Sequence, residues 1–157
     1  MLVDTRDLLI TPFILLYGEW EPEESRYLLG LLKPGMNFVD VGSNMGYVTC
    51  LALKGCMPGG QVWAFEADPQ LCQLTQENVL FNWYFEGVTV ENVAIYDRST
   101  TLRFNRRERF QGNSTVGQPD AAEVRKFGDT VTSFDVKAIS LDEYFLPKNA
   151  RVRPDAS

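Results

Sequence analysis

The sequence contains no histidine among its 157 residues. This absence excludes catalysis by Ser–His or Cys–His pairs, a histidine general base and histidine ligands for a metal ion. Basic residues are also few, since Lys and Arg total 15 against 21 for Asp and Glu, a formal net charge of -6. A chain of this sign has no general attraction to phosphate backbones, so we expect no nucleic acid among its partners.

Cysteine is scarce as well. The three cysteines, Cys50, Cys56 and Cys72, form no C-x-x-C pair, and their odd number fits reduced thiols at core or helix positions. Asp4 and Asp7 stand where a secretory signal would be basic, and no small-residue cleavage pattern follows. These features favour a cytoplasmic protein.

The sequence has no apolar run long enough to cross a membrane. The stretch from Leu8 to Tyr17 is largely apolar, but it is shorter than the ~20 residues of a membrane helix and contains Thr11 and Pro12. We interpret it as a buried strand or as a segment that covers the core.

What the sequence does contain is typical of a soluble globular protein: 45% hydrophobic, 12% aromatic and 23% charged residues. A chain of this length hides about two-thirds of the surface that it exposes when unfolded, which is enough for an apolar core without disulfides or metals. We therefore expect one folded domain.

Strands and helices are predicted to alternate through the first two thirds of the chain. Pro22, followed by acidic residues, opens a helix, and Asp68-Pro69 caps another. The expected order is a helix from Pro22, a strand at Phe38–Val41, a helix at Met45–Lys54, a strand at Gln61–Phe65, a helix after Asp68 and a strand at Val88–Ile95. This order predicts an α/β fold with a doubly wound, mostly parallel sheet.

The pattern changes after Asp97. We predict strands at Thr100–Phe104 and Val131–Ile139, a polar loop over residues 105–129 and a helical turn at Leu141–Phe145. Two basic clusters fall in this region, and we interpret them as solvated charge runs: Arg103, Arg106, Arg107 and Arg109, and then Arg125 and Lys126. The residues from 146 to 157 have little to bury and are expected to fray.

The most informative segment is Asp40-Val41-Gly42-Ser43-Asn44-Met45-Gly46-Tyr47, where a predicted strand turns into a predicted helix. Glycines there let the backbone bend and allow a ligand to approach the amides at the start of the helix. Glu66 ends the next strand, 24 residues after Gly42, where an acidic side chain can accept both ribose hydroxyls of a bound nucleoside.

The spacing of the glycines favours one type of cofactor. Dinucleotide sites use G-x-G-x-x-G, whose middle glycine lets a pyrophosphate approach the backbone. Asn44 occupies that place here, leaving Gly42-x-x-x-Gly46. A cofactor without phosphate, such as S-adenosylmethionine, still fits along this turn, so we favour a methyl donor over a nicotinamide.

These motifs, taken together, resemble the FkbM family of S-adenosylmethionine-dependent methyltransferases. The resemblance rests on residues 32–47, on Phe65-Glu66-Ala67-Asp68-Pro69, on Asn92-Val93-Ala94-Ile95, on the acidic motif Glu19-Trp20-Glu21-Pro22 and on Ile139-Ser140-Leu141-Asp142-Glu143-Tyr144. It extends from about residue 18 to residue 145 and implies a Rossmann-like class I methyltransferase fold.

The resemblance also implies a set of cofactor-binding residues. The turn would supply Asp40, Gly42, Ser43, Asn44, Gly46 and Tyr47. Glu66 would hold the ribose, and Glu21 would help to anchor the amino acid end of the cofactor. Ala67 and Asp68 would flank the adenine, together with Ala94 and its neighbours Asn92 and Val93. The general base is left unassigned.

The family normally continues with a strand resembling "I-K-I-D-V-E-G", which this chain does not contain. We therefore expect a sheet that is incomplete on its C-terminal side, with an apolar edge covered by a missing region or by another copy in a homo-oligomer. The domains expected are an N-terminal segment and helix over residues 1–35, a cofactor-binding methyltransferase domain over 36–145 and a flexible tail over 146–157.

The leading hypothesis is an S-adenosylmethionine-dependent methyltransferase. The resemblance implies O-methylation of a small-molecule or glycan acceptor, namely a sugar, glycolipid or natural-product hydroxyl. The alternative is a catalytically silent cofactor-binding or assembly module. Tyr47, Asn113 and Ser114 are possible contacts to a substrate, but packing or loop roles are the favoured interpretation for each.

Overall fold

The computed structural model describes residues 1–146 and contains two three-stranded sheets. The first sheet is parallel, in the order β1-β2-β3. Its strands are β1 (Asn37–Val41), β2 (Gln61–Phe65) and β3 (Val88–Glu91). Because β1 and β2 are crossover-linked parallel neighbours, the predicted α/β class with a mostly parallel sheet is confirmed.

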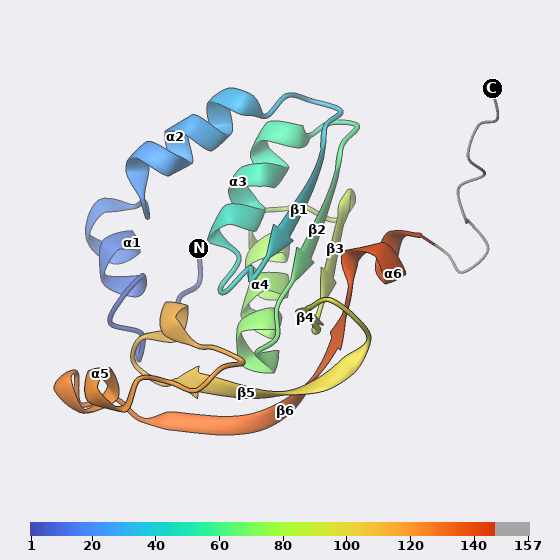
Figure 1. Cartoon of the computed structure of the whole chain (residues 1–157). Coiled ribbons are helices and arrows are strands. Elements are labelled where there is room, and N and C mark those ends of the chain that lie inside the picture. Colours follow the sequence, from blue (N-terminus) through green and yellow to red (C-terminus); the bar gives the residue numbers. More distant parts are fainter. Residues whose placement is uncertain (147–157) are drawn as a thin grey trace.

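Two helices cover one face of this sheet: α3 (Tyr47–Cys56) and α4 (Pro69–Phe81) (Figure 1). Alternate residues of β2 point to opposite faces, so Val62 packs with Leu53 and Val79 in the core beneath the helices. Trp63 and Phe65 contact α6 (Leu141–Phe145) on the other face. The predicted helical positions of the three free cysteines, on α3 and α4, are confirmed.

The cap of α4 also agrees with the prediction. The Asp68 carboxylate accepts hydrogen bonds from the backbone N–H groups of Gln70 and Leu71. The predicted start of α3 at Met45 is wrong by two residues, because Asn44 and Gly46 have positive φ angles that no helix tolerates. α2 (Pro22–Leu31) begins at the predicted proline.

The predicted strand Val88–Ile95 is not one strand. It breaks after β3, and β4 (Ala94–Ile95) joins the second sheet. The break occurs at Asn92, whose side-chain amide donates to the carbonyl oxygens of Glu66 and Ala67. Those contacts hold Asn92 beside the residues that follow β2, where the ladder between β2 and β3 ends.

The second sheet has the order β4-β6-β5. β5 (Thr100–Arg107) and β6 (Val131–Ile139) are antiparallel and form the long hairpin below the first sheet in Figure 1. The predicted loop over residues 105–129 is more ordered than expected. It includes the end of β5, a 3-10 turn η1 (Gln111–Asn113) and α5 (Ala121–Lys126), whose first turn is capped by Asp120.

The interpretation of the arginine cluster as a solvated run is wrong for two of its members. Arg106 and Arg107 are buried, and their guanidinium groups pair with Asp68 and Asp129. Only Arg103 and Arg109 of this cluster are exposed. Sequence reasoning missed this because the acidic partners are 38 and 22 residues away along the chain.

Of the two interpretations of Leu8–Tyr17, the buried strand is wrong, since residues 11–17 form α1 (Thr11–Tyr17). Pro12 lies in the first turn, where its missing N–H is tolerated. The Asp7 carboxylate accepts from the N–H groups of Ile10 and Thr11, which would otherwise lack partners.

β1 is an edge strand in the described part of the molecule. Its residue Val41 is 53% exposed and Val39 is 37% exposed. Residues 1–146 contain no helix with the length and apolar character needed to cross a membrane. The sequence predicts that residues 146–157 fray. Of these residues, the structure describes only Leu146.

Candidate cofactor site

The turn between β1 and α3 is fixed against the end of β2. The N–H groups of Gly42 and Ser43 both donate to the carbonyl oxygen of Phe65, at 2.8 and 3.1 Å. Gly42, Asn44 and Gly46 all have positive φ angles of 53° to 83°. Glycine adopts this conformation without strain, and asparagine tolerates it better than most residues do.

Glu66 lies beside this turn and is almost fully buried. One carboxylate oxygen accepts from the N–H of Asn44 at 2.7 Å and the other from the N–H of Asp68 at 2.8 Å. Burial raises the pKa of Glu66 to about 7, although the hydrogen bonds from Asp68 and Asn44 act in the opposite direction. Each oxygen keeps a second lone pair, which can accept a hydroxyl of a ligand.

A cavity of about 550 Å³ opens at this end of the parallel sheet. Its volume lies within the roughly 300–1,000 Å³ that is usual for small-molecule and cofactor sites. Eight of the eleven predicted cofactor-binding residues line it: Glu21, Gly42, Ser43, Asn44, Tyr47, Glu66, Ala67 and Ala94.

The other three predicted residues, Asp40, Gly46 and Asp68, do not line the cavity. Asp40 accepts from the Thr49 hydroxyl at 2.6 Å, and burial raises the pKa of this aspartate. Gly46 packs so closely on Thr75 that a Cβ would lie 2.9 Å from its methyl group. Asp68 caps α4 and pairs with Arg106. These three residues support the wall of the cavity but do not face the cavity itself.

Two walls of the cavity come from parts of the chain that the motifs did not indicate. Leu9 and Ile10, before α1, form one of them beside Trp20, which belongs to the acidic motif Glu19-Trp20-Glu21-Pro22. The other is η1 with the residue that follows it: Gln111, Gly112, Asn113 and Ser114. The sequence indicates Asn113 and Ser114 as possible substrate contacts, but nothing in the local sequence pattern distinguishes Leu9, Ile10 or Gln111.

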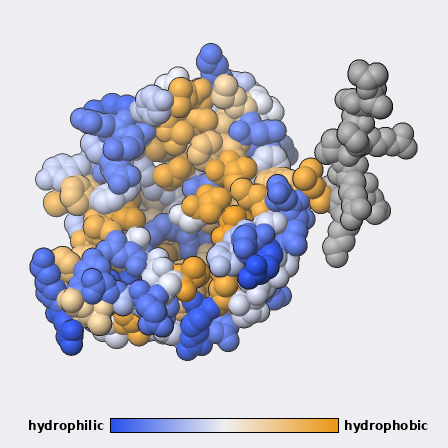
Figure 2. All heavy atoms as spheres, viewed as in Figure 1, coloured by the Kyte–Doolittle hydropathy of each residue, from blue (hydrophilic) through white to orange (hydrophobic). Residues whose placement is uncertain are grey.

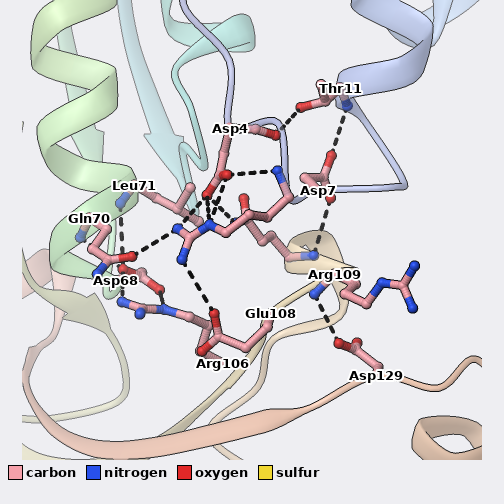
Figure 3. A network of polar contacts seen from close by, with 12 residues as sticks. Asp4, Asp7, Thr11, Asp68, Gln70, Leu71, Arg106, Glu108, Arg109 and Asp129 are labelled. Atoms are coloured by element: carbon pink, nitrogen blue, oxygen red, sulfur yellow. Dashed lines mark hydrogen bonds and ion pairs between the residues drawn. The ribbon is translucent and has the colours of Figure 1, made fainter.

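A network of polar contacts, partly buried, holds these walls in place (Figure 3). Asp7 accepts from the N–H of Gln111 at 3.3 Å, and the Gln111 side chain donates to Asp4 at 2.7 Å. Hydrogen bonds from Arg6 lower the pKa of Asp4 to about 2, so this carboxylate stays charged. The N-terminal segment and η1 are thus joined although they lie more than 100 residues apart.

The backbone of Glu21 is strained where it borders the cavity. Its φ angle is 44°, a conformation that a residue with a long side chain adopts only at a cost of order 1–3 kcal/mol. In residues 1–146 only three residues other than glycine have positive φ, and two of them, Glu21 and Asn44, line the cavity. Such strain is concentrated at ligand sites in proteins.

Comparison with protein families identifies the chain. The model of the methyltransferase FkbM domain matches residues 40–155, about three quarters of the sequence. The chain belongs to this family. The predicted family and fold class are therefore confirmed, and S-adenosylmethionine is the cofactor of this family.

Each individual relative matches only part of this chain. A protein-L-isoaspartate O-methyltransferase of Aeropyrum pernix is 38% identical over 47 residues, which is 30% of this chain and 18% of that protein. The structure of a SAM-dependent methyltransferase from Aquifex aeolicus is 24% identical, with a TM-score of 0.42. The match covers 55% of this chain and 45% of that protein's chain. The structure of a SAM-dependent O-methyltransferase from Thermotoga maritima is 21% identical, with a TM-score of 0.44. The match covers 55% of this chain and 36% of that protein's chain. This chain spans less than half of each of them.

The residues of the cavity fit S-adenosylmethionine. A buried carboxylate with free lone pairs stands at the end of β2, where it can accept from ribose hydroxyls. A Cβ built on Gly42 would meet nothing within 4 Å, so the space beside the turn is open to a ligand. No lysine or arginine of the described chain lines the cavity, in agreement with a cofactor that carries a sulfonium cation and no phosphate.

Proposed function

We propose that this chain binds S-adenosylmethionine in the cavity and transfers its methyl group to a hydroxyl of a sugar, glycolipid or natural product. The observation that carries the proposal is the position of Glu66, buried at the cavity wall with both oxygens oriented by backbone N–H groups. Pre-oriented acceptors of this kind bind a ribose without reorganisation.

We assign the remaining residues of the wall by their positions. Ala67 and Ala94 are small and apolar and suit the adenine ring, as the family resemblance implies. Gly42, Ser43 and Asn44 form the turn along which the sulfonium side of the cofactor would lie. Glu21 and Tyr47 border the same cavity, and we assign them to its amino acid end.

The cofactor would supply an activated methyl group. Bound in the cavity, it would offer this group to an acceptor oxygen, with the thioether S-adenosylhomocysteine as the leaving group. The hydroxyl proton passes to a base. The titratable groups on the cavity wall, Glu21, Tyr47 and Glu66, are assigned above to the cofactor, so the residue that acts as the base stays unassigned.

The test is calorimetric titration of the purified chain with S-adenosylmethionine, S-adenosylhomocysteine and NAD in parallel. Binding of the first two without NAD is the expected result. Tight binding of NAD, or binding of none of the three, would contradict the proposed cofactor site.

The second candidate is a module that holds the cofactor without turnover, and the exposed valines of the β1 edge favour it as a surface for assembly. The two candidates differ in one product. An enzyme forms S-adenosylhomocysteine when a hydroxyl acceptor is added, whereas a binding module forms none. What covers the β1 edge stays a prediction, to be checked by sedimentation of the chain at increasing concentration.

A further inference from the structure

The outer surface of α1 is apolar and exposed. Residues 8–18 contain no charged side chain, yet they are not buried as such a stretch normally is. Tyr17 is 70% exposed and Phe13 is 47% exposed. Figure 2 shows apolar side chains on the left of the molecule, where α1 lies, and beside the central hollow.

This apolar surface is continuous with the cofactor cavity. Trp20, which lines the cavity, makes an edge-on contact with the ring of Phe13 at a centroid distance of 5.2 Å. The ring of Phe13 in turn lies 6.0 Å from that of Tyr17. We name these three residues the aromatic strip. It begins at the cavity wall and ends at the solvent-exposed side of α1.

The charges nearest the aromatic strip are acidic, whereas the exposed Arg109 lies beside Leu8, at the other end of the apolar stretch. The two charged residues that line the cavity, Glu21 and Glu66, are both acidic. Glu19, Glu23 and Glu24 follow α1 closely, and the nearby Arg26 is already paired with Glu19 at 3.2 Å. An anionic acceptor or an anionic lipid surface would be repelled here, whereas an uncharged molecule is not.

We propose that the aromatic strip binds the apolar extension of an uncharged, amphiphilic acceptor, whose hydroxyl-bearing end enters the cavity. This inference rests on the proposed function and specifies its substrate class. Aromatic side chains suit this role because they offer a large apolar area with few rotatable bonds. The strip would then select acceptors by their apolar part.

The test compares two probes with the same neutral headgroup, n-octyl β-D-glucoside below its micelle concentration and methyl β-D-glucoside. Both are titrated into the chain loaded with S-adenosylmethionine, with octyl β-D-glucuronide as the matched anion. We expect the octyl glucoside to bind at least about tenfold more tightly than the methyl glucoside, since burial of about two methylene groups already gives that factor. The glucuronide should bind more weakly than the octyl glucoside.

The variant Phe13→Ser with Tyr17→Ser should remove the advantage of the octyl chain and leave the affinity for S-adenosylmethionine unchanged. Phe85→Ser is the matched control, because Phe85 is 67% exposed and lies outside the strip and the cavity. It should change neither affinity. Retained circular dichroism and melting temperature show that each variant is folded.

Three outcomes would overturn the proposal while the cofactor still binds. The octyl and methyl glucosides could bind equally, or the strip variant could lose no more than Phe85→Ser does. The strip variant could also convert a dimer into a monomer, which would mean that a second copy covers α1. Failure of S-adenosylmethionine to bind the unmodified chain would instead refute the proposed function.

Discussion

The parallel sheet has an apolar core cluster under its helices, whereas buried ion pairs hold the second sheet: Arg106 pairs with Asp68 beside the first sheet, and Arg107 pairs with Asp129 within the hairpin. The first core contains Leu53, Val62 and Val79. The second core is smaller, and beside it Arg106 and Arg107 reach Asp68 and Asp129. Apolar burial is non-directional, but a buried charge is tolerated only while its partner is in place. The hairpin, and with it the η1 wall of the cavity, therefore depends on charge pairing.

The largest effect is expected from breaking one of these pairs. Arg107→Ala leaves the buried Asp129 carboxylate without its cation and should lower the free energy of unfolding by about 3–5 kcal/mol. Arg103→Ala on the same strand is the control, because its pair with Asp135 is exposed and contributes less than about 1 kcal/mol. Denaturant unfolding of both variants provides the measurement. Equal losses would contradict the account of the hairpin.

The two regions should also respond to pH with opposite sign. The pKa of Glu66 is raised to about 7 from 4.5, so the folded state keeps a proton that the unfolded state has released between these values. The free energy of unfolding should fall by about 3 kcal/mol as the pH rises from 4.5 to 7. Unfolding curves across this range test it, and Glu66→Gln should remove the slope.

Asp129 in the hairpin gives the reverse dependence. Burial raises its pKa, but hydrogen bonds from the Arg107 side chain and from the Arg109 and Thr130 backbones outweigh this, so that its pKa is lowered below 3.8. Its stabilisation is present above pH 3.8 and is lost as the pH falls through the folded pKa. In a plot of the free energy of unfolding against pH, Asp129→Asn should reduce the slope below pH 3.8. It should leave the slope between pH 4.5 and 7 unchanged.

The smallest effects concern the turn. Gly42→Ala should cost about 1–2 kcal/mol, because its φ of 78° is unfavourable for alanine although the space is open. Gly46→Ala has the same strain and in addition a 2.9 Å contact with Thr75, so it should be the more destabilising of the two. Thermal unfolding ranks them. The reverse order would show that the turn can rearrange.

The parallel half could be predicted from the sequence because its signals are local. Gly42, Asp68-Pro69 and Glu66 each act on backbone groups within a few residues or at a fixed crossover distance. The hairpin could not be predicted as well. The sequence around Arg107 does not indicate whether its side chain is solvated or paired with Asp129. For the same reason the cavity wall from Leu9, Ile10 and Gln111 was missed, since contacts across 100 residues leave no local pattern.

We propose that Glu66 holds the ribose of S-adenosylmethionine. The direct measurement is the dissociation constant of Glu66→Gln by calorimetry at pH 8, beside Glu86→Gln, an exposed residue outside the cavity. Hydrogen bonds to a charged group contribute about 1.5–3 kcal/mol each, so the account predicts at least a roughly tenfold loss for Glu66→Gln and none for Glu86→Gln. Equal affinity of the folded Glu66→Gln variant and the unmodified chain would contradict it.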